Sequence, residues 1–233
     1  MKNNSITIKI QDGCSQKCSY CIVNILRGPS ISIDYNTIYT DISFFSKIRN
    51  TKNIWLCGIN TLEYFDKNIG DICSLIKRLI IDFPDMYFSL DFINPFNMDK
   101  LFNIMDLIKN NKDHLNNKFI ISIQSASNKI LANMHRPYTK DSLIKIFNYA
   151  KNNNINLHSE IIVGFPGETE EDFLETYNFL KKYKFDFQAK VFSPRPGTEA
   201  INLSNQVLEE VIIKRIKKYR ELKKELGYKE KED

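Results

Sequence analysis

Strand-like and helix-like hydrophobic patterns alternate along the whole chain. Short runs of alternating or clustered apolar residues predict strands, and apolar residues three or four positions apart predict helices. The predicted strands cover residues 5–9, 54–57, 86–93, 119–123, 157–163 and 187–192. The predicted helices cover residues 35–48, 72–81, 99–108, 127–134, 141–151 and 170–183, with a long charged helix over 206–231.

These elements form six strand–helix units of roughly 30 residues each, the size of a βαβ repeat. Alternation of this kind predicts a parallel sheet with right-handed crossovers. Six units fall short of the eight in a complete TIM barrel. The pattern therefore predicts an α/β fold, an open (β/α)6 partial TIM barrel with a C-terminal helix. No repeat or linker indicates a second domain, so residues 1–233 are predicted to form one.

Polar or glycine-containing segments follow each predicted strand. In parallel α/β folds, functional groups gather at the carboxyl ends of the strands. The segments are the cysteine loop after residue 9, Gly58–Asn60, Asn94–Pro95, Gln124–Ser125, Gly164–Gly167 and Ser193–Gly197. We expect the functional residues of the protein among them.

Composition narrows the class of protein only modestly. The 233 residues, 42% hydrophobic with 16 phenylalanines, are sufficient for a sizeable core, and the net charge of +5 is a weak indication of nucleic-acid binding. The first ten residues, MKNNSITIKI, lack the apolar core of a signal peptide, and no run is long enough to cross a membrane. The prediction is a soluble cytoplasmic protein with no membrane partner.

The segment QDGCSQKCSYC carries Cys14, Cys18 and Cys21 in a C-x3-C-x2-C spacing, with Tyr20 before the last cysteine. Three thiolates on one loop can bind three irons of a [4Fe–4S] cluster, which leaves the fourth iron open to a small molecule. A cluster that only transfers electrons normally has four cysteine ligands. The missing ligand therefore predicts chemistry at the open iron.

Zinc and a simple redox thiol are the alternatives for this loop. A structural zinc site needs four ligands, usually from a second Cys or His pair, and none of the three histidines forms one. A disulfide is disfavoured because nothing indicates an oxidising compartment. Cys57 and Cys73 lie in apolar surroundings and are predicted to be small buried hydrophobic residues.

The segment SEIIVGFPGETEEDF predicts a strand, a turn and a helix. Thr169 and Asp172 are spaced as a capping box, and three acidic residues in the first turn would repel phosphate. We therefore expect Gly164 and Gly167 to let the backbone approach a flat ring such as adenine rather than a phosphate.

The C-x3-C-x-aromatic-C spacing resembles the signature of the radical S-adenosylmethionine (SAM) superfamily. The resemblance implies the fold type of that superfamily and a [4Fe–4S] cluster on Cys14, Cys18 and Cys21. It also implies that SAM binds the open iron and is cleaved to methionine and a 5′-deoxyadenosyl radical.

Four blocks resemble the methylthiotransferases within that superfamily: QDGCSQKCSYCIVNILRG, ISIQSASNKILANMHRPYT, IIVGFPGETEEDF and SPRPGTEA. Members modify an adenosine of tRNA or an aspartate of a ribosomal protein, and the last block favours the tRNA branch. The family's N-terminal auxiliary-cluster domain and C-terminal TRAM domain are expected to be absent. A separate sulfur-donating or RNA-binding subunit would then be a partner.

The resemblance implies several cofactor-binding residues. The backbone of Tyr20 is expected near adenine, with a core tyrosine as the alternative, and Gln124 and Ser125 are expected to bind the SAM ribose or carboxylate. Glu160 is a buried carboxylate in an apolar strand that needs SAM, a lysine or an arginine as its partner.

Arg136 and Arg195 are candidates for the SAM carboxylate or for substrate, because the planar guanidinium suits carboxylate and phosphate. Arg27 is expected either in the same role or tying down the cysteine loop. Structural ion pairs are the alternative for all of these charged residues.

The leading hypothesis is a methylthiotransferase-like radical SAM enzyme that acts on tRNA and takes its electron from a flavodoxin or ferredoxin. Two alternatives stay open: a radical SAM enzyme of another reaction class, and a non-catalytic accessory protein. For the basic helix over 206–231, packing on the barrel with a solvated face is the first expectation and RNA contact the second.

Overall fold

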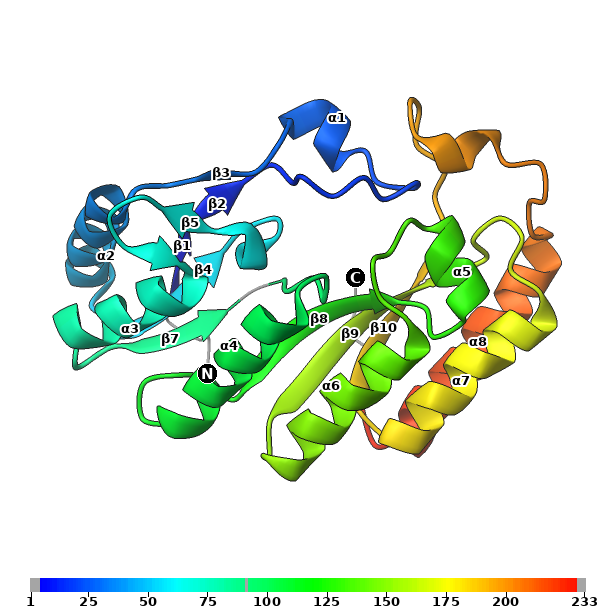
Figure 1. Ribbon diagram of the computed structural model, residues 1–233. Coiled ribbons are helices and arrows are strands. Elements are labelled where there is room, and N and C mark those ends of the chain that lie inside the picture. Colours follow the sequence, from blue (N-terminus) through cyan, green and yellow to red (C-terminus); the bar gives the residue numbers. More distant parts are fainter. Residues whose placement is uncertain (1–4, 91, 230–233) are drawn as a thin grey trace. The chain divides into compact units, whose positions relative to one another are not determined.

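The computed structural model describes residues 5–90 and 92–229, which fall into two compact units (Figure 1). Unit 1 contains the chain up to residue 16 together with residues 23–120 and 150–156. Unit 2 contains residues 17–22, 121–149 and the chain from residue 157 onward. The predicted single domain stays a prediction, and each unit is described separately below.

Unit 1 is built on a three-stranded parallel sheet in the order β1-β4-β7. Alternate side chains of β1 and β4 are buried in register, with Ile6 beside Ile54 and Ile8 beside Leu56, so one face of the sheet forms the core. The strands are Ser5–Lys9 (β1), Asn53–Cys57 (β4) and Tyr87–Leu90 (β7), and the main helices are Tyr35–Arg49 (α2), Ile72–Asp82 (α3) and Met98–Asn110 (α4).

Unit 1 also contains short elements that the hydrophobic pattern did not predict. The two-residue strands β2 and β3 pair antiparallel, as do β5 and β6. Their bounds, with those of two short helices, are Gln11–Asp12 (β2), Val23–Arg27 (α1), Ile31–Ser32 (β3), Thr61–Glu63 (η1), Phe65–Asp66 (β5) and Gly70–Asp71 (β6). Elements this short are too brief for a periodicity to be visible.

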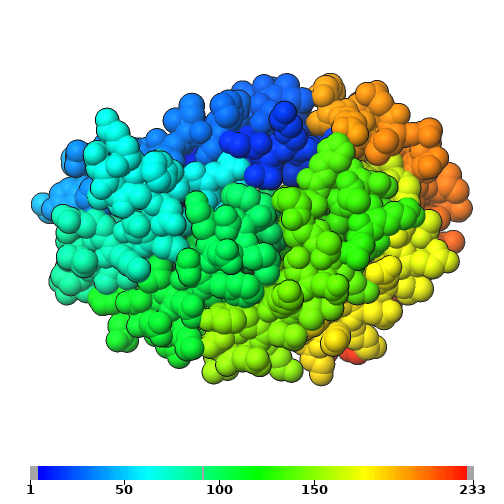
Figure 2. Space-filling model, viewed as in Figure 1, coloured from blue at the N-terminus to red at the C-terminus, as the bar shows by residue number. Residues whose placement is uncertain are grey.

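Unit 2 is built on the sheet β10-β9-β8, whose strand β8 begins just before the boundary between the units. Strands β9 and β10 pair in parallel. The outer surfaces of α5 to α7 run from green to yellow in Figure 2. The strands are Lys118–Gln124 (β8), Asn156–Val163 (β9) and Asp186–Val191 (β10), and the helices are Asn128–Asn133 (α5), Lys140–Asn152 (α6), Glu170–Tyr183 (α7), Glu199–Asn202 (η2) and Glu209–Glu225 (α8).

Side chains that precede a helix determine where several helices begin. The carboxylate or hydroxyl of the N-cap residue accepts a backbone N–H of the first turn, which satisfies a donor that has no partner inside the helix. Asp34 caps α2, Asp71 caps α3 and Ser127 caps α5 in this way. Thr169 and Asp172 form the predicted capping box of α7.

The final helix is shorter and more buried than its sequence suggests. α8 begins at Glu209 and not at residue 206, and it ends at Glu225 because Gly227 adopts a left-handed backbone with φ of +80°. The predicted continuation through residue 229 is therefore wrong, and residues 230 and 231 lie outside the described residues. Arg215 and Lys223, expected on a solvated face, are buried.

The predicted strand over 86–93 includes residue 91, which lies outside the described residues; β7 ends at Leu90. None of the helices in the described part of the chain combines the length and the apolar character that crossing a membrane requires.

Candidate functional site

In unit 1, the start of the cysteine loop is held by backbone contacts. The Cys14 N–H donates to the Gly28 carbonyl at 3.1 Å, and the Cys14 carbonyl accepts from Asn24 Nδ2 at 2.7 Å. Gly13 has φ of +68°, and a Cβ there would lie 2.2 Å from the Pro29 carbonyl oxygen, so only glycine fits. This packing fixes the backbone that carries the half-buried Cys14.

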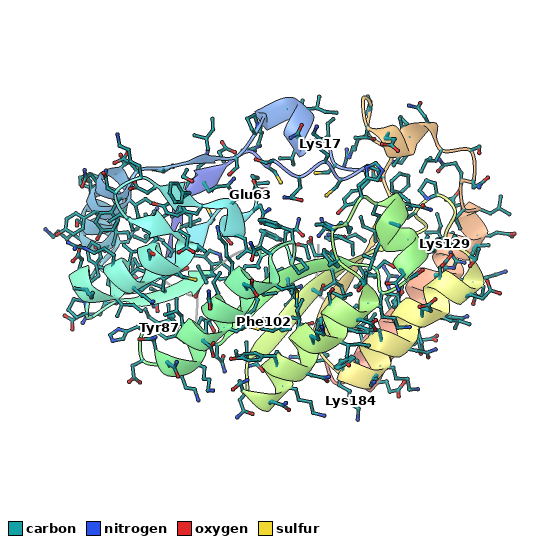
Figure 3. The ribbon with its side chains drawn as sticks, viewed as in Figure 1. Lys17, Glu63, Tyr87, Phe102, Lys129 and Lys184 are labelled. Atoms are coloured by element: carbon teal, nitrogen blue, oxygen red, sulfur yellow. The ribbon has the colours of Figure 1, made fainter. Side chains whose placement is uncertain are left out.

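Two charged contacts reinforce that part of the loop. Arg27 Nη1 donates to Asp12 Oδ1 at 2.9 Å, which confirms the expectation that Arg27 ties down the loop. Glu63, labelled in Figure 3, accepts from the Ser15 N–H at 2.8 Å and from Gln16 Nε2 at 3.0 Å. The loop is therefore bonded to η1 as well as to the segment after α1.

In unit 2, Ser19 anchors the half of the loop that carries Cys18 and Cys21. Its N–H donates to the Met134 carbonyl at 3.2 Å, its hydroxyl donates to the Asn133 carbonyl at 2.7 Å, and its own carbonyl accepts from the Ala200 N–H at 2.8 Å. These bonds hold the loop to the end of α5 and to η2. Both cysteines are half-buried, and neither is in a disulfide.

Arg136 points its guanidinium at one of these cysteines. Nη1 donates to Cys18 Sγ at 3.2 Å, Nη2 donates to the Ser122 carbonyl at 2.6 Å, and Nε donates to the Tyr138 hydroxyl at 2.7 Å. Burial disfavours the charge on Arg136, but Tyr138, Tyr20 and Cys18 favour it, and the net effect raises the pKa of this group. The guanidinium is therefore a buried, permanently charged neighbour of Cys18.

The Tyr20 side chain belongs to the apolar core of unit 2. Its ring packs edge-on against Phe165 with centroids 6.4 Å apart, beside a buried cluster that includes Ile130 and Met134. Burial raises the pKa of the Tyr20 hydroxyl well above its ordinary value. The core position agrees with the alternative for the ring, and the predicted approach of its backbone to adenine stays a prediction.

Gln124 and Ser125 lie at the carboxyl end of β8, as predicted. Gln124 is buried and has φ of +63°, a left-handed conformation that is uncommon for any residue except glycine. The Ser125 hydroxyl lies 3.1 Å from Thr176 Oγ1 and accepts from the Ser127 N–H at 3.1 Å. Ser125 thus joins β8 to α7, whereas the Gln124 side chain has no such bond to any residue that the structure describes.

The turn after β9 packs directly against α8. Gly164 has φ of +78°, and a Cβ there would lie 2.6 Å from two carbons of Ile212, so the close approach at this glycine is to α8. Glu168 Oε2 accepts from the Gly164 N–H at 2.8 Å and from Arg215 Nη1 at 2.8 Å. Burial raises the pKa of Glu168 to about 7, against the lowering effects of the Gly164 N–H and Arg215.

Glu168 and Arg215 were not among the predicted site residues. The predicted role of Gly164 toward adenine stays a prediction. The sequence signal that could have found Glu168 is its place directly after Gly167, in the turn already singled out. Arg215 had no such signal, because it lies among basic residues of the same helix, Lys214, Lys217 and Lys218, which the structure leaves exposed.

Glu160 is less buried than the sequence suggested, and Arg195 is exposed. Glu160 is half-buried rather than buried, because it lies at an incompletely covered position of β9, and its carboxylate has no bonded partner within residues 5–90 and 92–229. Arg195 is exposed in the loop after β10; its carbonyl accepts from Thr198, and no side-chain partner of its guanidinium lies in the described part of the chain. Both side chains are therefore accessible to a ligand.

Asp172 links the starts of α5 and α7. It accepts from the Ser127 hydroxyl at 2.7 Å and from Lys129 Nζ at 2.6 Å, and it also accepts from Thr169 in the capping box. Figure 3 labels Lys129 on α5. Burial alone would raise the pKa of Asp172, but the bonds from Lys129, Ser127 and Thr169 lower it to about 2.

The donor set of the cysteine loop fits an iron–sulfur cluster. Cys14, Cys18 and Cys21 are not in disulfides, and cysteine thiolates are the soft ligands that iron–sulfur clusters take. A cluster distributes its thiolates over different irons and benefits from hydrogen bonds to sulfur, which Arg136 supplies at Cys18.

Comparison with known proteins defines the class. The family model described as the radical SAM superfamily matches residues 8–180, and the chain belongs to that superfamily. Its cofactors are accordingly a [4Fe–4S] cluster and SAM, as the sequence predicted. The coproporphyrinogen III oxidase HemN of Escherichia coli has a similar fold, with a TM-score of 0.66 at 15% identity over 97% of this chain and 53% of that one. This likeness confirms the predicted fold class.

The more particular resemblance is to tRNA-modifying enzymes. The chain is 30% identical to a tRNA-2-methylthio-N(6)-dimethylallyladenosine synthase of Fusobacterium nucleatum, over 97% of this chain and 52% of that enzyme. It is 27% identical to the threonylcarbamoyladenosine tRNA methylthiotransferase MtaB of Treponema pallidum, over 90% of this chain and 43% of that enzyme. The chain thus spans about half the length of these curated relatives.

Proposed function

We propose that this protein is a methylthiotransferase-like radical SAM enzyme whose substrate is a tRNA nucleoside. The observation that carries the proposal is the loop with Cys14, Cys18 and Cys21, none of them in a disulfide, whose backbone is hydrogen-bonded at Cys14 and at Ser19. The similarity to tRNA methylthiotransferases over at least nine-tenths of the chain supports the substrate class.

Each part of the chain has a defined task in this proposal. The three cysteines hold the cluster, and the aromatic wall of Tyr20 and Phe165 helps to exclude water. When bound, the cluster and SAM supply a 5′-deoxyadenosyl radical. Gln124 and Arg195 orient the polar groups of SAM or substrate. A flavodoxin or ferredoxin supplies the electron.

Anaerobic reconstitution followed by incubation with SAM and dithionite tests the enzymatic step. We expect about four irons per chain and formation of 5′-deoxyadenosine. The matched control is the triple variant Cys14→Ala, Cys18→Ala, Cys21→Ala, which should bind no cluster and form no product. A cluster-loaded wild type that leaves SAM intact would instead support the accessory-protein hypothesis.

Mass spectrometry of tRNA nucleosides from cells with and without the gene tests the substrate. Loss of a methylthioadenosine nucleoside in the deletion strain, restored by the wild type and not by the triple cysteine variant, is the expected result. An unchanged nucleoside profile from an enzyme that cleaves SAM would indicate another reaction class.

A further inference from the structure

The surroundings of Arg136 suggest a role different from the one its sequence predicts. Its backbone N–H donates to the Leu131 carbonyl just after α5, and His135 before it has a left-handed φ of +55°. The side chain is 8% exposed. The backbone therefore turns sharply after α5, and Arg136 points into the protein.

The guanidinium is fixed in orientation by two protein groups. Tyr138 accepts from Nε, and its own hydroxyl lies 3.0 Å from both the Ser122 and the Ile123 carbonyl oxygens. The Arg136 guanidinium also lies over the Tyr138 ring, 5.1 Å from its centre. With Nη2 on the Ser122 carbonyl, little rotational freedom remains for the group.

The third nitrogen, Nη1, lies 3.2 Å from Cys18 Sγ. A buried cation is costly unless an anion or several hydrogen bonds compensate it, and the Cys18 sulfur is one of the acceptors of this guanidinium. A charged N–H donor withdraws electron density from the sulfur it contacts, and hydrogen bonds to ligand sulfurs help to set the reduction potential of iron–sulfur clusters.

We propose that Arg136 is a positioning residue that holds Cys18 as a cluster ligand and makes the cluster easier to reduce. The proposal rests on the proposed function, because Cys18 must be a cluster ligand. It differs from the expectation that Arg136 binds the SAM carboxylate, since its three nitrogens are directed at Ser122, Tyr138 and Cys18. The chemistry is a single-electron reduction with no bond made or broken at Arg136.

An EPR-monitored redox titration of the reconstituted full chain, without SAM, tests the proposal. In Arg136→Gln the equilibrium constant for one-electron reduction should fall about tenfold, which lowers the midpoint potential by about 59 mV. Arg136→Lys keeps the charge but loses the fixed fork, so its midpoint should lie between those of Arg136→Gln and the wild type. Arg78→Gln, at an exposed arginine that pairs with Asp82 in unit 1, is the matched control and should titrate as the wild type does.

Iron content and SAM binding separate the possible outcomes. An Arg136→Gln chain that binds the cluster but has an unchanged midpoint potential overturns the proposal. If SAM also no longer perturbs the EPR spectrum of that variant, Arg136 is a SAM ligand instead. If Arg136→Gln does not bind a cluster, the same titration of Arg136→Lys decides. A lowered midpoint potential supports the proposal, and an unchanged midpoint potential overturns it. A wild-type chain that binds no cluster overturns the proposed function itself.

Discussion

Gly164 and Gly167 have nearly the same backbone conformation but different surroundings. Their φ angles are +78° and +84°, in the region where a side chain is strained. A Cβ at Gly164 would lie 2.6 Å from Ile212, whereas the nearest atom to a Cβ at Gly167 is Asn133 Nδ2 at 4.0 Å. The two positions therefore separate backbone strain from steric overlap.

Alanine substitution at the two glycines should reveal that difference. Gly167→Ala should lower the free energy of unfolding by about 1 to 2 kcal/mol through backbone strain. Gly164→Ala should lose a further 1 to 3 kcal/mol, roughly, from overpacking against Ile212. Denaturant unfolding measures both losses. When Ile212→Ala is combined with Gly164→Ala, part of the stability lost in Gly164→Ala should return. Equal losses at the two glycines would contradict the assigned contact with α8.

Spacing in the sequence indicates some candidate site residues, whereas the surroundings of others depend on the fold, for a physical reason. The three cysteines follow from spacing, because the chemistry needs three thiolates on one loop. Arg136 was predicted as a charged ligand-binding residue, but only the fold shows that its guanidinium is directed at Cys18. Glu160 was expected to be buried and is half-buried. Burial and side-chain direction depend on tertiary packing, which sequence periodicity does not describe.

The junction of α5 and α7 depends on an ionised Asp172. Its pKa is lowered from 3.8 to about 2, so its contribution to stability is complete above pH 3.8 and is lost as the pH falls through 2. Asp172→Asn should destabilise the protein by about 1 to 3 kcal/mol at neutral pH. In strong acid its free energy of unfolding should differ less from that of the wild type. Unfolding measured from pH 2 to 6 tests this.

Asp141→Asn is the control for that experiment, because Asp141 is an exposed acidic residue in the first turn of α6. It should change stability little at any pH in the range. A pH profile of Asp172→Asn that runs parallel to that of the wild type would show that ionisation of Asp172 is unimportant.

The contact between α8 and the turn after β9 should contribute to stability with a pH dependence opposite to that of the α5–α7 junction. The pKa of Glu168 is raised from 4.5 to about 7, so its contribution to stability is complete below pH 4.5 and is lost as the pH rises through 7. The groups acting on it are the Gly164 N–H and Arg215, with Asp172 and Tyr219 nearby. Glu168→Gln should remove this slope.

The difference in unfolding free energy between Glu168→Gln and the wild type, measured from pH 4 to 8, tests the prediction. Glu170→Gln, at a half-exposed carboxylate that also pairs with Arg215, is the matched control. Its profile should stay parallel to that of the wild type. A Glu168→Gln profile that does the same would contradict the raised pKa.

At the scale of helices and strands, local sequence signals predicted where helices begin better than where they end. The capping box of α7 was visible in the sequence, because Thr169 and Asp172 are three residues apart. The end of α8 was placed too late, because a run of charged residues with good helix propensity continues beyond the helix. The left-handed Gly227 ends it instead.

Across the whole chain, a single cluster should use only the three loop cysteines. Burial raises the pKa of the Cys73 thiol to about 11, which makes a thiolate scarce, and Cys57 lies half-buried at the end of β4. The double variant Cys57→Ala, Cys73→Ala should retain about four irons per chain after reconstitution. Cys18→Ala is the comparison and should lose most of them. Loss of iron from the double variant would show a second cluster ligand set.

The fold class was predictable because six strand–helix repeats leave a strong alternation in the sequence. The small sheets β2-β3 and β5-β6 were not, because two-residue strands form only where the rest of the fold brings them together. The same limit applies to Arg215, whose burial depends on Glu168, 47 positions earlier in the chain.

A protein engineer who shortened this chain would be tempted to begin with its lysine-rich last helix, and that choice would be a poor one. Without α8, the Glu168 carboxylate would lose Arg215, its ion-pair partner. The rings of Phe173 and Phe187, which Tyr219 covers at centroid distances of 5.1 and 5.8 Å, would become exposed. Exposure of apolar core surface removes part of the roughly 5 to 15 kcal/mol that keeps a domain folded. The trimmed polypeptide should therefore accumulate in inclusion bodies.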